Sequence, residues 1–314
     1  MRVLVVGAGA TGGYFGARLA EAKRDVTFLV RPARAEKLAA QGLRLRSPVG
    51  DFLLDRPQTV TADKLEGESP FDLVLLSCKA YDLDAALADV APAVGPSSAV
   101  LPLLNGMRHL EKLDETFGQA RVLGGSCAIV ATLTRDGEIR QMSELHTLTY
   151  GERDGSRSER VGRIEALMQG VAFQARGSEK ILLEMWEKWV FLATLAGATT
   201  LMRGAIGDIV GAEGGRAFIE ALLEECSTIA EASGFAPREK FLAGSRKTLT
   251  SEGSAMTASM LRDIENGARI EADHIVGDLI ARGRATAPEA GRPLLGQVYT
   301  HLTAYERRRA RQAA

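Results

Sequence analysis

The sequence contains few of the residues on which several classes of protein depend. Its 3 cysteines are widely spaced and form no Cys-x-x-Cys pair, so neither a disulfide framework nor a metal site is expected. No run approaches 18 uncharged apolar residues, and the apolar run after Arg2 is too short for a signal peptide. Lys and Arg total 39 against 40 Asp and Glu, so the basic surplus of a nucleic-acid binder is missing. We therefore expect a cytoplasmic protein that binds neither nucleic acid nor membrane.

Glycine is abundant instead, at 33 of 314 residues, and the length suggests two domains. In the first half, short β-branched runs alternate with helical patterns, which predicts an α/β domain with a parallel sheet. The expected strands are Arg2–Val6, Asp25–Val30, Phe71–Cys78 and Ala99–Leu104, and the expected helices are Thr11–Ala22, Ala33–Gln41 and Asp84–Val90. Turn signals around Gly50 and Gly137 predict two hairpins whose antiparallel strands make the sheet mixed. These hairpins are Leu43–Ser47 with Phe52–Leu54 and Val122–Leu133 with Glu138–Gln141.

After about Tyr150 the pattern becomes helical. Val161–Gln169 predicts a helix and Val171–Gln174 a last strand, while Glu179–Met202 is apolar nearly all round and predicts a buried central helix. The later expected helices are Ala217–Ala232, Pro237–Ser245, Thr257–Glu265, Glu271–Arg282 and Pro293–Gln312. We therefore expect a Rossmann-type α/β domain over residues 1–178 and an all-helical domain over residues 179–314.

The motif Gly7-Ala8-Gly9-Ala10-Thr11-Gly12 directly follows the first strand and opens the first helix, which is the context of a dinucleotide-binding loop. The first glycine permits the tight turn, the second lets the backbone approach a pyrophosphate, and the third allows close helix–strand packing. The helix N-terminus then offers free N–H groups to the phosphates. The alternative is a tight strand–helix turn without a ligand.

Arg31 follows the second expected strand, 19 positions after Gly12. An NAD site usually has a carboxylate about 20 residues beyond the glycines to hold the ribose hydroxyls. A guanidinium can instead bind a 2′-phosphate with two hydrogen bonds. The sequence therefore predicts NADP(H) as cofactor, with Arg34 as a second candidate contact, against the alternative of a solvated surface arginine.

Polar residues also end two further expected strands. Lys79 follows the third strand and Asn105 follows the fourth. Because ligands of open α/β sheets bind at the carboxyl ends of the strands, both residues are expected to face the cofactor or the substrate. Taken singly, Lys79 could be a surface charge and Asn105 a turn former.

Lys188 lies within the apolar helical segment, on one face with Leu192 and Ala196. Burial beside apolar side chains disfavours the charged form, so its pKa is expected below the ordinary value of about 10.4. A lysine tuned in this way can donate a proton to a developing alkoxide. The alternatives are an i,i+4 ion pair with Glu184 and a side chain that extends along the helix to the surface.

A last polar cluster contains Ser259, Asp263 and Glu271. Asn266-Gly267 is expected to end one helix, which places Glu271 in the first turn of the next, on the stripe of Ile275 and Leu279. A carboxylate there is favoured by the helix dipole without any further role, and helix capping is an equally ordinary account of Ser259.

In this order the residues resemble the ketopantoate reductase family (2-dehydropantoate 2-reductases), over almost the whole chain. The resemblance rests on the glycine motif, Arg31, Ser77-Cys78-Lys79-Ala80, Leu104-Asn105-Gly106-Met107, Trp186-Glu187-Lys188, Ser259-Met260-Leu261-Arg262-Asp263-Ile264 and Glu271-x-Asp273. It implies a dinucleotide-binding domain and a helical domain with the site in the cleft between them. It also implies reduction of a 2-oxo acid by NADPH, which yields pantoate for coenzyme A synthesis.

The resemblance assigns roles to individual residues. Lys188 would be the general acid on the substrate carbonyl, and Glu271 would orient the substrate and bind its hydroxyl. Ser259 would contact the substrate carboxylate, and Asn105 and Lys79 would lie near the nicotinamide. The expected cofactor-binding residues are then Gly7, Gly9, Ala10, Thr11, Gly12, Arg31, Lys79 and Asn105.

One departure concerns the residues four and eight positions after the lysine. The family pattern has asparagines there, whereas this chain has Leu192 and Ala196; Thr199 or Thr200 could substitute in part. A site without these groups could accept a less hydroxylated or more apolar 2-oxo acid. Two alternatives therefore remain: a paralogous NADP-dependent reductase of another small 2-oxo or hydroxy acid, and an NADPH-binding sensor without turnover. A homodimer through the helical domain is compatible with the sequence, which identifies no interface.

Overall fold

The computed structural model describes residues 1–288 and 291–313. Contacts between Cα atoms separate the chain into two compact units. The first comprises Met1–Leu104 and His109–Ile181, and the second comprises Asn105–Arg108 and the chain from Leu182 onward. The sequence-based division falls after residue 178, whereas this one falls after Ile181 and gives the loop Asn105–Arg108 to the second unit.

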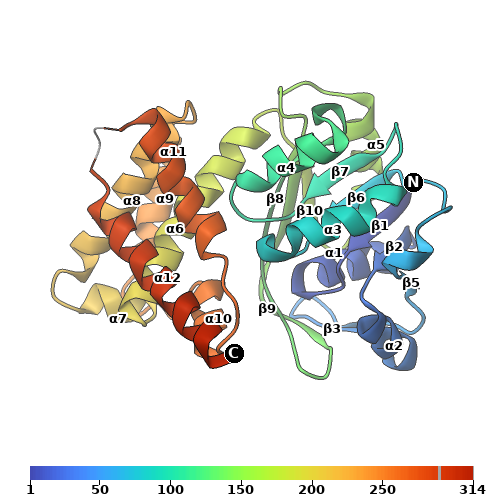
Figure 1. The fold of residues 1–314 in the computed structure, drawn as a ribbon, viewed down its shortest axis with the longest axis horizontal. Helices are drawn as coiled ribbons and strands as arrows, with labels where there is room; N and C mark the ends of the chain where they lie inside the picture. Colours follow the sequence, from blue (N-terminus) through green and yellow to red (C-terminus); the bar gives the residue numbers. More distant parts are fainter. Residues whose placement is uncertain (289–290, 314) are drawn as a thin grey trace. The chain divides into compact units, whose positions relative to one another are not determined.

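The first unit is built on a five-stranded parallel sheet in the order β5-β2-β1-β6-β7 (Figure 1). The strands are β1 (Arg2–Val6), β2 (Asp25–Leu29), β5 (Gln58–Val60), β6 (Leu73–Leu76) and β7 (Ala99–Pro102). The central strands β1 and β6 are continuous apolar runs because both of their faces are covered. The strand order reverses between β1 and β6, which is where open α/β sheets bind ligands.

The helices of this unit are α1 (Ala10–Glu21), α2 (Pro32–Gln41), α3 (Leu83–Val90), α4 (Arg108–Phe117) and α5 (Glu159–Met168), with short 3-10 turns at Ala62–Lys64, Ala80–Asp82, Ala91–Ala93 and Gln119–Arg121. Helix α1 packs against β1 and β2 on one side. Its other side contacts a second sheet. The hydrophobic core of the unit therefore surrounds α1, with Tyr14, Phe15 and Leu19 fully buried.

The second sheet corrects the expectation of one mixed sheet. Its strands are β3 (Leu43–Arg46), β4 (Phe52–Leu54), β8 (Gly124–Leu133), β9 (Ile139–Gly151) and β10 (Gln174–Gly177). They follow the order β10-β9-β3-β4, with β8 antiparallel to β9. The hairpin strands thus form a separate mixed sheet, and the central sheet stays wholly parallel. The expected strand Val171–Gln174 is also wrong in position, since β10 begins at Gln174.

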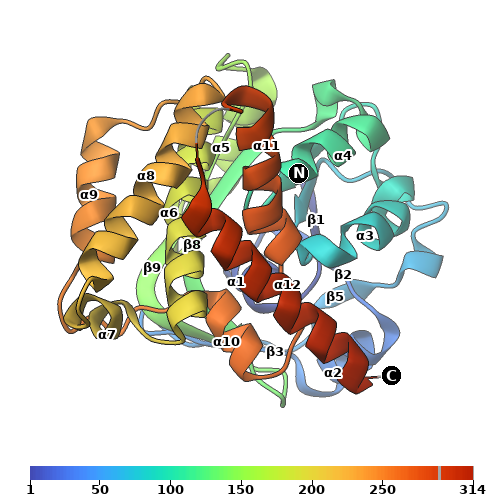
Figure 2. The same cartoon turned by 60° about the vertical axis from the view of Figure 1, so that its left-hand side comes forward.

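The second unit is helical, as the sequence predicts. It contains α6 (Ile181–Met202), α7 (Ile206–Gly211), α8 (Gly215–Ala232), α9 (Glu239–Leu249), α10 (Ser259–Glu265), a π-turn (Asp273–Gly277), α11 (Asp278–Thr286) and α12 (Pro293–Ala313). In Figure 2, α6 and α8 lie side by side. At Gly197 of α6, a Cβ would stand 2.9 Å from Leu222 of α8 and 3.3 Å from Val298 of α12. The central helix is therefore closely packed on two neighbours. Among the described residues, no helix combines the length and apolarity that a bilayer span requires.

Candidate functional site

The glycine loop joins the end of β1 to the start of α1. Gly7 has a φ of +93°, which permits the turn, and Gly9 is the N-cap residue of α1. A Cβ at Gly12 would lie 2.0 Å from Ser77 Oγ and 2.4 Å from the Gly7 carbonyl oxygen, so only glycine allows this packing. A Cβ at Gly9 would meet nothing within 4 Å. The first turn of α1 contains no acidic residue that would repel a phosphate, so its backbone N–H groups suit a phosphate.

Two arginines flank this loop in different ways. Arg31 precedes α2 with its side chain 78% exposed, and its guanidinium lies 3.2 Å from the Asp82 carboxylate. Arg34 is half-buried and donates to the carbonyl oxygens of Ala8 at 3.0 Å and Gly137 at 3.2 Å. Burial lowers the pKa of Arg34. Arg31 is thus the more available cation, whereas Arg34 braces the glycine loop.

The end of β6 brings further polar groups to the same sheet edge. The Ser77 hydroxyl donates to the Val6 carbonyl at 2.8 Å, and Lys79 is half-buried directly before the 3-10 turn that ends at Asp82. Because β2, β1 and β6 are neighbours, Arg31, the glycine loop and Lys79 follow adjacent strands. Sequence reasoning missed Asp82, whose proximity to Arg31 depends on two loops that are distant in the chain.

Lys188 is half-buried on α6, between two buried neighbours. Glu187 is 3% exposed and accepts hydrogen bonds from the Arg238 backbone N–H at 2.9 Å and from its Nε at 2.8 Å. On the other side, the Trp189 indole Nε1 donates to the Ile275 carbonyl at 2.9 Å. These bonds fix the rotation of α6 about its axis, and with it the direction in which Lys188 leaves the helix.

Glu271 lies directly before the helical chain that contains the π-turn. The expectation that it stands within the first turn is wrong by one residue, since the helical conformation begins at Ala272. The Glu271 carbonyl accepts from the Ile275 N–H at 3.0 Å. Ser259 is exposed at the first position of α10. The preceding Ala258 donates its N–H to the Thr199 hydroxyl of α6 at 3.3 Å, which docks α10 on the lysine-bearing helix.

The loop after β7 belongs to the same helical unit. Asn105 is half-buried, and Gly106 reverses the chain with a φ of +75°. A Cβ at Gly106 would lie 3.1 Å from both the Cδ2 atom and the carbonyl oxygen of His274. Sequence reasoning missed His274, because no local pattern shows that a residue of the π-turn contacts this loop.

The face of α6 beyond Lys188 is apolar. Leu192 is half-buried and Ala196 is buried. The Thr199 and Thr200 hydroxyls donate to the Leu195 and Ala196 carbonyls at 2.7 and 2.6 Å. Their protons therefore remain within the helix, and neither hydroxyl replaces an amide as a hydrogen-bond donor.

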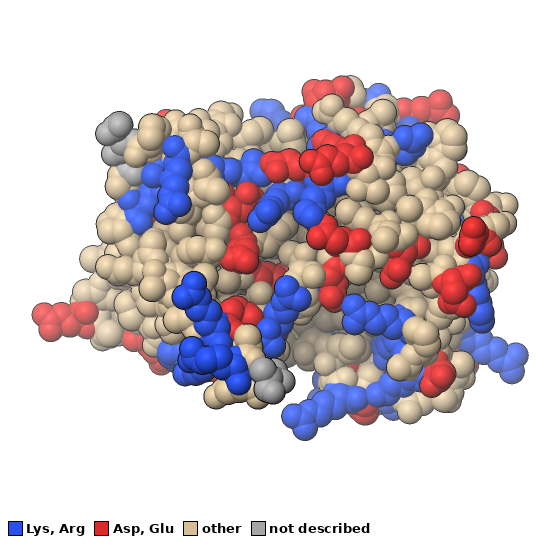
Figure 3. Space-filling view, viewed as in Figure 1, with Lys and Arg blue, Asp and Glu red and all other residues tan. Residues whose placement is uncertain are grey.

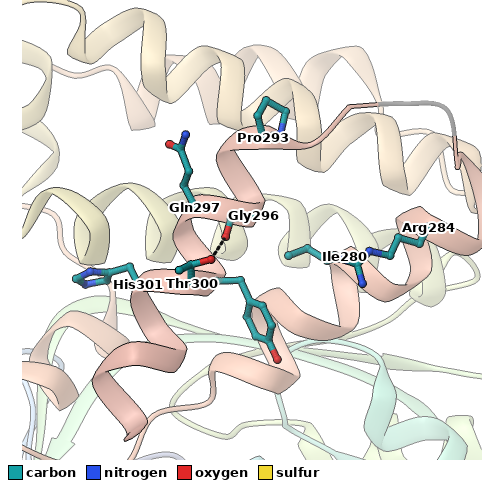
Figure 4. Close-up of a pocket in the computed structure, with 8 residues that line it drawn as sticks. Ile280, Arg284, Pro293, Gly296, Gln297, Thr300 and His301 are labelled. Atoms are coloured by element: carbon teal, nitrogen blue, oxygen red, sulfur yellow. Dashed lines mark hydrogen bonds between the residues drawn. The ribbon is translucent and has the colours of Figure 1, made fainter. Parts of the chain in front are cut away.

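A pocket of about 630 Å³ lies elsewhere in the second unit, beside α11 and α12 (Figure 4). Ile280 and Arg284 line it from α11, and Gln297, Thr300 and His301 from α12. None of the site residues expected from sequence lines this pocket. On the face shown in Figure 3, positive and negative side chains are interspersed, with no continuous basic surface.

The structure thus defines an α/β unit, with a glycine loop at the switch point of a parallel sheet, and a helical unit that contains a half-buried lysine. Two family models match the chain: ketopantoate reductase PanE/ApbA over residues 3–155 and ketopantoate reductase PanE/ApbA C terminal over residues 180–306. The chain belongs to the ketopantoate reductase family and is an oxidoreductase.

Two relatives agree with this assignment, and one solved structure shares the fold. The chain is 39% identical to the uncharacterized oxidoreductase YkpB of Bacillus subtilis, over 98% of this chain and 99% of that protein. It is 29% identical to the 2-dehydropantoate 2-reductase of Mesorhizobium japonicum, over 90% of this chain and 92% of that protein. A ternary structure of D-mandelate dehydrogenase with NADH and anilino(oxo)acetate has the same fold, with a TM-score of 0.87 at 20% identity and coverage of 99% of both chains.

Proposed function

We propose that this oxidoreductase reduces 2-dehydropantoate to pantoate with NADPH. The observation that carries the proposal is Lys188, a half-buried lysine whose neighbours Glu187 and Trp189 are both fixed by hydrogen bonds, in a chain of the ketopantoate reductase family. The cofactor fits the first unit because the open space at Gly9 and the acid-free N-terminus of α1 suit a pyrophosphate. Arg31 would hold the 2′-phosphate.

The proposed roles of the residues are those that the resemblance to the family implies. When bound, NADPH supplies a hydride to the carbonyl carbon of the substrate. The Lys188 ammonium stabilises the negative charge that develops on the carbonyl oxygen and donates a proton to it. Glu271 orients the substrate through its hydroxyl, Ser259 binds the substrate carboxylate, and Asn105 and Lys79 position the reacting groups.

A second candidate is reduction of a more apolar 2-oxo acid by the same residues. The apolar surface of Leu192 and Ala196 favours it, because the Thr199 and Thr200 hydroxyls do not supply the missing donors. Each hydrogen bond that a hydroxylated substrate can no longer make weakens its binding by about 0.5–1.5 kcal/mol. That is enough to change substrate preference without abolishing the chemistry.

The test is the rate of NADPH consumption on a panel of 2-oxo acids: 2-dehydropantoate, its analogue without the hydroxyl, an unbranched analogue and an aromatic one. We expect the highest kcat/KM with 2-dehydropantoate, and a higher kcat/KM with NADPH than with NADH. Much faster turnover of an apolar analogue would establish the second candidate instead. NADPH binding without oxidation on any member of the panel would leave only a cofactor-binding sensor.

A further inference from the structure

His274 is a buried titratable residue that the proposed chemistry does not use. It is 8% exposed and lies in the π-turn Asp273–Gly277, three residues after Glu271. Turns of this kind interrupt α-helices rarely and often occur at functional sites. We propose that His274 is a positioning residue that holds the Asn105 loop against the segment carrying Glu271. This inference rests on the proposed function, which gives Asn105 and Glu271 their roles.

The first support is the close approach of the Asn105 loop to His274. A Cβ at Gly106 would lie 3.1 Å from His274 Cδ2 and 3.2 Å from its Nε2, which is tighter than ordinary van der Waals contact. Gly106 also has a φ of +75°, a conformation that other residues adopt with strain. The loop therefore needs glycine both for its turn and for its contact with the imidazole.

The second support is a hydrogen bond between the His274 ring and the Asn105 backbone. The bond favours the protonated ring, as only a bond to an acceptor does, so the imidazole donates to the Asn105 carbonyl. Burial has the larger effect and lowers the pKa below its ordinary value; among nearby charges, Glu271 and Asp278 raise it and Arg108 lowers it. The neutral ring is therefore the form that holds the loop at neutral pH.

The third support is that the π-turn itself is anchored on two helices. Trp189 of α6 donates to the Ile275 carbonyl at 2.9 Å. Tyr299 of α12 donates to the Asp273 carboxylate at 2.7 Å. His274 lies between these two anchored residues, so its ring is presented from a fixed backbone. The orientation of Asn105 is then set by the helical unit and by the same segment that contains Glu271.

The test compares three substitutions of His274. His274→Leu removes the hydrogen-bond donor, whereas His274→Asn and His274→Gln keep an amide donor near one or the other ring nitrogen position. We expect His274→Leu to lower kcat/KM for the 2-oxo acid about tenfold or more, and at least one amide variant to recover threefold or more of that loss. His301→Leu, at a half-buried histidine on α12, is the matched control and leaves kcat/KM within about twofold.

A double-mutant cycle with Asn105→Ala separates positioning from general stability. If His274 acts through Asn105, His274→Leu changes kcat/KM less than about twofold in the Asn105→Ala background. Additive losses, or amide variants as impaired as His274→Leu, would show that His274 contributes only to packing and would overturn the inference.

Hydrogen exchange of the amides at 105–108 tests the contact without any turnover. We expect faster exchange in His274→Leu than in the parent or in the better amide variant, and no change in His301→Leu. A parent that reduces no 2-oxo acid refutes the proposed function alone, and the exchange result then decides the contact. An active parent whose amide exchange is unchanged by His274→Leu refutes the positioning role alone.

Discussion

Arg31 carries the expected choice between the two nicotinamide dinucleotides. Its guanidinium is mostly exposed and lies 3.2 Å from Asp82, and such a surface pair contributes only about 0–1 kcal/mol. The arginine is therefore available to a phosphate. We predict that Arg31→Ala weakens NADPH binding by about 1.5–3 kcal/mol, the contribution of a charged hydrogen bond, with little effect on NADH.

Fluorescence titration of both nucleotides measures this difference. Asp82→Asn is the informative partner variant, since it removes the competing carboxylate and should tighten NADPH binding or leave it unchanged. Equal losses for NADPH and NADH in Arg31→Ala would reject a role in binding the phosphate.

Lys188 carries the expected proton transfer. We predict that Lys188→Ala lowers kcat about 100-fold or more, as for loss of a general acid, while nucleotide binding stays close to that of the parent. Lys240→Ala, at an exposed lysine on α9, is the control and should leave kcat unchanged. Steady-state and single-turnover rates decide; near-normal turnover of Lys188→Ala would make the lysine a structural residue.

For single residues, the sequence identifies the candidate site residues better than it identifies the residues that they contact. The glycine loop and Lys188 are recognisable because each stands in a local pattern, after a strand or on an apolar helix. The contact of Arg31 with Asp82 and that of Asn105 with His274 join residues that are distant in the chain, and no local pattern encodes them. The occupied hydroxyls of Thr199 and Thr200 likewise depend on their side-chain orientation in the folded helix.

At the scale of elements, two glycines of the strand–loop–helix junction differ in the space that surrounds them. Gly9 faces open space, whereas Gly12 packs against Ser77 and the Gly7 carbonyl. We predict that Gly12→Ala destabilises the protein by about 1–3 kcal/mol, because overpacking displaces its neighbours. Gly9→Ala should cost about 0.5–1 kcal/mol, because alanine is a poorer N-cap residue than glycine, yet weaken NADPH binding at least tenfold.

Denaturant unfolding and nucleotide titration of both variants measure these effects. Gly244→Ala provides the control, since a Cβ at this exposed glycine of α9 would meet nothing within 4 Å. It should stabilise the protein by about 0.5–1 kcal/mol through helix propensity. Unchanged NADPH affinity in Gly9→Ala would refute the dinucleotide role of the loop.

Elements were predictable where their pattern is strong. The apolar strands β1 and β6 and the long helix α6 follow from the sequence with small errors at their ends. The short strand β5 and the shifted strand β10 are mostly polar, and their existence depends on pairing with β2 and β9. The separation of the hairpins into a second sheet follows from their packing around α1, which is a tertiary effect.

At the scale of the whole molecule, three of the four histidines give stability a defined pH dependence. Burial lowers the pKa of each of His146, His274 and His301, and it is the largest effect on all three. The unfolded chain then binds protons below about pH 6.5 that the folded chain does not. Stability therefore rises with pH through this window, and is lost as the pH falls below about 6.5.

We predict a melting temperature that is nearly constant from pH 8 to 7 and falls between about pH 6.5 and 5. His146→Gln should flatten part of this decline, although it also removes the contact of 2.6 Å between the Tyr14 hydroxyl and Nδ1. A further decline is expected below about pH 4.3, the ordinary pKa of a glutamate, because the hydrogen bond from Arg140 lowers the pKa of Glu138 in the folded chain. Melting temperatures that do not change between pH 7 and 5 would contradict the histidine assignment.

Because the loop Asn105–Arg108 belongs to the helical unit, the two units cannot be exchanged as continuous segments of the sequence. The chain leaves the first unit after Leu104, returns at His109 and departs again after Ile181. A chimera of two relatives joined only near residue 181 would take this loop from one parent and His274 from the other. Exchange of the helical half between relatives should therefore succeed only when these few loop codons travel with it.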